Sequence, residues 1–107
     1  MRLWTLAVAA GLLWPASVFC QGGPAFYISG NQLYEDCSVN NSFCFGYVAG
    51  TADAFSKDRT ACIEKGVTVR QAVDIVMNYL RENPKYRQIS ASLLAGTALG
   101  QAFPCKQ

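Results

Sequence analysis

The sequence predicts an all-α fold: a small, disulfide-stapled helical bundle of about four helices that follows a cleaved signal peptide. Three observations lead to this fold class. The region from Thr68 to Cys105 has apolar residues at helical spacing on both sides of a proline break. Four cysteines, an even number, follow a segment that has the layout of an export signal. The 107 residues leave room for a single domain, which is small enough to need cross-links.

The segment that begins at Thr68 is expected to form an amphipathic helix. Thr68 and Gln71 match a capping box, in which each side chain bonds a free N–H group of the first turn. The helix should end at Asn83, since the residue before a proline is disfavoured in the α region. Its expected apolar face comprises Val69, Ala72, Val73, Val76 and Leu80.

A second helix is expected directly after the break, because Pro84 suits the first turn of a helix. The two helices would then form an αα-hairpin. The apolar face of the second helix would be formed by Tyr86, Ile89, Leu93 and Leu94 and extended by Thr97 and Ala98.

The N-terminal part divides into a signal peptide over residues 1–20 and a flexible arm over residues 21–29, followed by the helical domain over residues 30–107. A basic start, a short apolar run and a Trp-Pro break are typical of a secretory signal. Cleavage after Cys20 or after Gly22 fits the sequence. Lipidation of Cys20 is the alternative, although Phe19 stands where lipoprotein signals have a small residue. The sequence therefore predicts a periplasmic protein without a membrane span after signal cleavage.

Composition argues against several functions. Loss of Arg2 leaves eight basic and seven acidic side chains, and this near balance does not suit nucleic-acid binding. The sequence has no histidine and no pair of cysteines at CxxC spacing, so neither a catalytic triad nor a common zinc site is expected. We expect no enzyme activity, no cofactor and no metal.

Two disulfides are expected from Cys37, Cys44, Cys62 and Cys105, and four cysteines allow three pairings. Cys62–Cys105 is the first choice, because these cysteines flank the ends of the two antiparallel helices that should lie together. Cys37 and Cys44 flank one turn, so that their bridge would close a short loop. Pairings of Cys44 with Cys62 or Cys105 stay open.

The region before Thr68 is expected to contribute two further helices. Residues 30–37 would form about two turns with Leu33 and Tyr34 facing inward, and Ser42 is a fair N-cap. Residues 43–55 carry one charge and are expected to form the buried central helix, with a strand as the competing interpretation. We expect its Gly46 and Gly50 to touch the similarly spaced glycines 96 and 100. Its charged residue, Asp53, would contact a partner, bond a polar group inside the bundle, or face solvent.

The loop over residues 57–66 carries five charges around Cys62 and is the candidate recognition loop. A solvated connector is the simpler interpretation. The candidate partner-binding residues, chosen on this loop argument alone, are Lys57, Asp58, Arg59, Glu64 and Lys65.

Over Gly30 to Cys105 the chain resembles the Rap/Tai family of small exported immunity proteins, which protect bacteria that use type VI secretion from peptidoglycan-amidase toxins. The resembling motifs are Cys44 with Gly46-Tyr47, Gly50 with Asp53, Val67-Thr68 with Gln71, Tyr79-Leu80 with Pro84, and Ala102-Phe103-Pro104-Cys105. The family often has a histidine near the Pro84 break, where this chain has Asn83 and Gln88.

The resemblance implies an all-helical periplasmic domain, often a homodimer, that binds a cognate cell-wall amidase and obstructs its active-site cleft. It implies no catalytic residue. The alternative function is a small structural or chaperone-like cell-envelope protein with no toxin partner.

Overall fold

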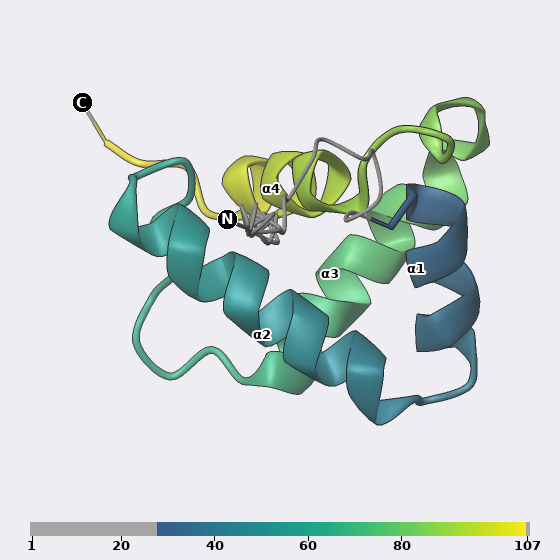
Figure 1. Ribbon diagram of the computed structural model, residues 1–107. Coiled ribbons are helices and arrows are strands. Elements are labelled where there is room, and N and C mark those ends of the chain that lie inside the picture. The colour runs from purple at the N-terminus through teal and green to yellow at the C-terminus, as the bar shows by residue number, and fades with distance from the viewer. Residues whose placement is uncertain (1–27, 107) are drawn as a thin grey trace, which may run out of the picture.

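The computed structural model describes residues 28–106, and these form the expected all-helical bundle. Its helices are α1 (Gly30–Ser38), α2 (Ser42–Lys57), α3 (Val69–Glu82) and α4 (Ala91–Ala102), with a short 3-10 turn, η1 (Pro84–Tyr86), between the last two. Each helix packs against the other three, and α2 passes in front of α3 below α4 in Figure 1. The predicted signal peptide and residues 21–27 of the predicted arm lie outside the described residues. None of the described helices is long and apolar enough to cross a membrane.

The capping box at the start of α3 is confirmed. The Gln71 N–H donates to Thr68 Oγ1 at 3.1 Å, and the Thr68 N–H donates to Gln71 Oε1 at 2.8 Å. The apolar face is buried at its predicted positions except the first, Val69, which is 42% exposed. The helix ends at Glu82 before the Asn83–Pro84 break, as expected. Local sequence signals therefore set both ends of this helix.

The expected helix directly after Pro84 begins later than predicted. Residues Pro84–Tyr86 form only the 3-10 turn, and α4 starts at Ala91. The reason is tertiary, because the carbonyls of Arg87 and Ile89 accept hydrogen bonds from the first N–H groups of α1 at 2.7 and 2.8 Å. Those carbonyls complete the N-terminus of α1 instead of continuing a helix. As a result Tyr86, Ile89 and Leu93, predicted to be core residues, are 37–60% exposed.

The start of α1 requires a glycine because the chain passes so close to this segment. A Cβ on Gly30 would lie 2.9 Å from the Arg87 carbonyl oxygen and would overlap the side chain of Leu94. The two preceding residues already belong to the fold, since Ser29 caps α1 and the Ile28 carbonyl accepts from the Ala91 N–H at 2.8 Å. Leu33 is fully buried as predicted, and Tyr34 is half-buried.

The prediction that residues 43–55 form the buried central helix is correct for the helix and wrong for the extent of burial. Within α2 the buried residues are Cys44 and Val48, and Phe43 is 48% exposed. The low charge of α2 reflects small residues, which lie at a surface at little cost. Its N-cap is Asn41 rather than Ser42, since Asn41 Oδ1 accepts from the Phe43 N–H at 2.6 Å. The most buried helix is α4, through Ala91, Leu94, Ala95, Gly96, Ala98 and Leu99.

The predicted contact between the glycines of α2 and those of α4 is wrong. A Cβ added to Gly46 or Gly50 would meet no atom of the described residues within 4 Å. On α4, a Cβ on Gly96 would lie 2.6 Å from the ring of Phe55, and one on Gly100 would lie 2.9 Å from the Thr60 carbonyl oxygen. The glycines of α4 therefore make room for a ring and for a backbone turn, whereas those of α2 face open space.

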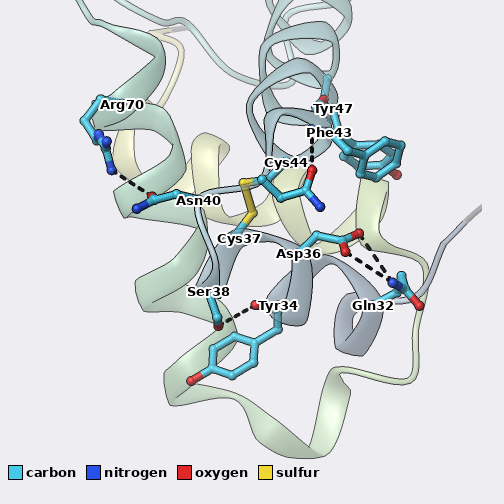
Figure 2. Close-up of a disulfide and its surroundings, with 12 residues drawn as sticks. Gln32, Tyr34, Asp36, Cys37, Ser38, Asn40, Phe43, Cys44, Tyr47 and Arg70 are labelled. Carbon is cyan, nitrogen blue, oxygen red and sulfur yellow. Dashed lines mark hydrogen bonds between the residues drawn. A yellow bond between two sulfur atoms is a disulfide. The ribbon is translucent and has the colours of Figure 1, made fainter.

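Both disulfides have the pairing that was the first choice. Cys37–Cys44 closes the turn between α1 and α2 with Cα atoms 5.0 Å apart, and Cys62–Cys105 joins the loop before α3 to the segment after α4, with Cα atoms 4.9 Å apart. Figure 2 shows the first bridge beside Asn40, whose side-chain oxygen accepts a hydrogen bond from Arg70 on α3. The two bridges fasten both connections that flank α2.

Candidate partner-binding surface

The predicted recognition loop begins where α2 ends. Asp58 is the C-cap, Arg59 has the left-handed φ of +64°, and the Thr60 N–H donates to the Phe55 carbonyl at 3.0 Å. This bond between the second residue after the cap and the third helical residue before it is that of a Schellman motif. Glycine usually occupies the left-handed position of this motif, because it has no Cβ to clash. Here the position presents an arginine side chain.

The next residues attach the loop to the body of the domain. The Ala61 N–H also donates to the Phe55 carbonyl, at 3.2 Å, and the Ala61 side chain is fully buried. The Cys62 N–H donates to the Phe103 carbonyl at 2.8 Å, beside the Cys62–Cys105 disulfide. The middle of the loop is therefore held in place by the buried Ala61 side chain, by backbone hydrogen bonds and by a disulfide.

A tight turn follows this attachment. The Val67 N–H donates to the Glu64 carbonyl at 3.2 Å, and Gly66 has a φ of +98°. A positive φ at the third residue is the signature of a type II turn, which requires glycine or asparagine there. The turn places Glu64 and Lys65 at its first and second positions, directed away from the core.

All five predicted partner-binding residues are exposed. They form two groups, Lys57–Arg59 before the attached segment and Glu64–Lys65 after it. Within residues 28–106, no side chain of opposite charge lies within 4.0 Å of any of them. The charges are thus available to a partner, since none is neutralised by a described neighbour.

The carboxylate of Asp58 is held by the loop itself. A side-chain hydrogen bond with Thr60, together with the bond from the Thr60 N–H to Asp58 Oδ1 at 2.9 Å, lowers the pKa of Asp58 below its usual value. These bonds favour the charged form. At neutral pH the aspartate therefore both keeps its charge and supports the left-handed residue that follows it.

A groove that the sequence did not predict adjoins the loop. It has a volume of about 190 Å³ and lies between α2, the loop and the start of α3. Asp53 lines the groove from α2 and is exposed, and its side chain makes no hydrogen bond or ion pair to the rest of the described chain. Of the three interpretations considered for Asp53, burial inside the bundle is therefore wrong. The sequence signal for the groove was the apolar residues Ile63 and Val67, which flank the charged pair Glu64–Lys65.

The described part of the chain holds no group of three or more histidine, cysteine, aspartate or glutamate side chains that could bind a metal ion. Burial raises the pKa of Tyr47 on α2, and a hydrogen bond with Ser92 partly offsets this. That tyrosine lies beside an open apolar groove that includes Gly46 and Gly50.

One comparison with known proteins identifies relatives of this domain. The family model described as Rap1a immunity proteins matches residues 29–105. The matched range begins just before α1 and ends at the cysteine that follows α4, so it includes every described helix. No curated protein and no solved structure matches the chain.

Proposed function

The chain belongs to the Rap1a immunity protein family, and we propose that it binds and occludes a peptidoglycan amidase delivered by a type VI secretion system, which protects the producing cell. The observation that carries this proposal is the family match across the whole helical domain. An immunity protein acts by binding a toxin rather than by catalysis. The amidase class of the toxin is our inference from the resemblance of the sequence motifs to the Rap/Tai proteins.

The location of the protein suits a toxin that attacks the cell wall. Its two disulfides indicate a compartment outside the cytoplasm, where such bonds persist. We propose that the compartment is the periplasm, and that residues 1–20 act as the signal peptide that directs export. An amidase that cuts peptidoglycan would meet its inhibitor there.

We place the contact on the loop that carries Lys57, Asp58, Arg59, Glu64 and Lys65. Loops held by a rigid scaffold often carry recognition residues, and here the scaffold is a disulfide, a Schellman motif and a type II turn. Because the loop is already held in shape, little conformational entropy would be lost when a partner binds.

The test uses the disulfide-bonded mature chain and the peptidoglycan amidase effectors of the producing strain, each with its nucleophile inactivated. Isothermal titration should give a tight complex with equal numbers of the two chains, and addition of the protein should abolish peptidoglycan hydrolysis by the matching active amidase. Absence of binding to every amidase effector of that strain would contradict the proposal. Reversal of the loop charges, as in Lys57→Glu with Arg59→Glu, should weaken the complex, whereas Glu35→Lys on α1 should not.

We also propose that the protein is a homodimer. Support comes from large apolar side chains at the surface, among them Val39, Phe43 and Leu93, which are 72%, 48% and 60% exposed. Burial of such side chains against a second copy would remove apolar area from water. Light scattering coupled to size exclusion should give twice the mass of the chain, and Leu93→Glu should shift it toward the monomer. A monomeric mass for the unchanged protein would refute the dimer.

A further inference from the structure

The groove beside the recognition loop has walls from three parts of the chain. Its lining residues come from the second half of α2, from the first turn of α3 and from the connection between these helices, where Ile63, Val67 and Thr68 contribute. We call it the Asp53 groove, and its lining residues are Ala49, Ala52, Asp53, Ser56, Ile63, Val67, Thr68, Val69 and Ala72. Its volume of about 190 Å³ suits one long side chain better than a folded segment.

The groove combines apolar side chains with two hydroxyl residues, Ser56 and Thr68, and a single charge. Asp53 is the charged residue among its lining residues, and in the described part of the chain no lysine or arginine nitrogen lies within 4.0 Å of its carboxylate. Val69, which lines the groove from α3, is 42% exposed, although it begins an otherwise buried face. A guest that suited this groove would therefore have an apolar stem and a positive end.

An anionic guest is disfavoured, even though the start of α3 borders the groove. The capping box already occupies the Thr68 and Gln71 N–H groups with side-chain oxygens at 2.8 and 3.1 Å. Asp53 would also repel a negative group. Lysine and arginine have both the apolar stem and the positive end that the groove requires. Their methylene stems pack on apolar surface while the charged end reaches a carboxylate.

We propose that the Asp53 groove receives one lysine or arginine side chain of the amidase that the protein inhibits. This inference rests on the proposed function and adds a specific anchor to it. The groove is continuous with the recognition loop, since Ile63 and Val67 line the groove while Glu64 and Lys65, between them, face outward. A partner that covers the groove as well as the loop would withdraw its basic side chain from water beside a carboxylate that pairs with no side chain of residues 28–106.

The test compares the dissociation constants of the disulfide-bonded protein and its variants with the matching amidase. Asp53→Asn keeps the shape of the groove and removes its charge, and should weaken binding by at least about 10-fold, as expected for loss of a desolvated charge partner. Ala52→Leu keeps the charge and fills the groove, and should weaken binding by a similar factor. Glu35→Gln removes an exposed carboxylate on α1 and should change binding less than about 2-fold. Thermal unfolding of each variant shows that it is folded.

A double-mutant cycle identifies the guest. Among alanine substitutions of the lysines and arginines of the amidase, one should weaken binding to the unchanged protein and have almost no further effect on Asp53→Asn. If the unchanged protein binds while Asp53→Asn binds equally well, the groove proposal is overturned and the proposed function stands. Absence of binding by the unchanged protein would overturn the proposed function and the groove proposal with it.

Discussion

Replacement of Arg59 by glycine is expected to stabilise the domain and to weaken partner binding at the same time. Arg59 has a φ of +64° at the end of α2. For an L-residue this left-handed conformation is about 1–2 kcal/mol less stable than the right-handed helical one. Glycine relieves this strain but loses about 0.5–1 kcal/mol more backbone entropy on folding. The net gain in the free energy of unfolding should be about 0.5–1 kcal/mol, which corresponds to a rise in Tm of about 2–8 °C for a domain of this size.

The same substitution removes an exposed guanidinium from the recognition loop. If Arg59 contacts the amidase, its loss should weaken the complex by at least about 5-fold, because arginine is enriched among the residues that dominate interfaces. Circular dichroism during heating measures the stability of Arg59→Gly, and isothermal titration with the amidase measures its affinity. The two effects have opposite signs, so a general loss of structure would not produce both.

Asn40→Gly provides the matched control. Asn40 has a φ of +53° in the equivalent position after α1, where the Asn41 N–H donates to the Asp36 carbonyl at 3.3 Å. Asparagine tolerates this conformation better than arginine does, and Asn40→Gly also removes the hydrogen bond from Arg70, so the gain in Tm should be smaller. Binding should be unchanged. A fall in Tm for Arg59→Gly would refute the strain argument, and unchanged affinity would show that Arg59 makes no contact of consequence.

Three further measurements test the packing and electrostatics of the domain. Gly46→Ala should raise the free energy of unfolding by about 1 kcal/mol, because no described atom would meet the added Cβ of this helical glycine. Gly100→Ala should lower the free energy of unfolding by about 1–3 kcal/mol, because its Cβ would lie 2.9 Å from a backbone carbonyl oxygen. If denaturant titrations gave changes of the same sign for both variants, the packing described for these glycines would be contradicted. In the chain-entropy model, replacing Cys62 and Cys105 by serine should lower the free energy of unfolding by about 4 kcal/mol. Replacing Cys37 and Cys44, which close a shorter loop, should lower it by about 2.5 kcal/mol. The reverse order in the same assay would refute this entropic explanation. Folding lowers the pKa of Asp58, so the ionised carboxylate stabilises the folded state. This stabilisation is complete above the pKa of the unfolded chain, about 3.9, and is lost as the pH falls through the lower pKa of the folded chain. Titration of the Asp58 carboxyl carbon by NMR should give a midpoint below about 3.9, and a midpoint at or above that value would contradict the hydrogen bonds assigned to it.

The sequence was sufficient where structure depends on neighbours along the chain. The ends of α3 follow from the Thr68–Gln71 capping box and from Pro84, and both signals act within a few residues. The start of α4 could not be predicted in this way. It depends on carbonyls of Arg87 and Ile89 that accept hydrogen bonds from α1, which lies more than fifty residues earlier in the chain. An amphipathic pattern cannot show that a distant helix will use those groups.

The same limit explains the glycines and the groove. The spacing of Gly46 and Gly50 predicts a flat helix face but does not say whether another element covers it, and no element among residues 28–106 does. The loop charges were correctly predicted to be exposed, because charge alone keeps such residues in water. The conformation of Arg59 and the groove beside Asp53 depend on how the loop returns across α2, and only the folded chain brings those groups together.

The arrangement of the loop connects its cross-links to the proposed function. An exposed segment with this many charges would ordinarily lose much conformational freedom when a partner orders it. Here the backbone at Thr60, Ala61 and Cys62 is already bonded to α2 and to the segment after α4, and one disulfide prevents these attachments from separating. Charged side chains on a backbone held in this way can complement a rigid enzyme cleft at lower entropic cost. Reduction of the Cys62–Cys105 bridge should therefore weaken partner binding even under conditions in which α3 and its capping box persist.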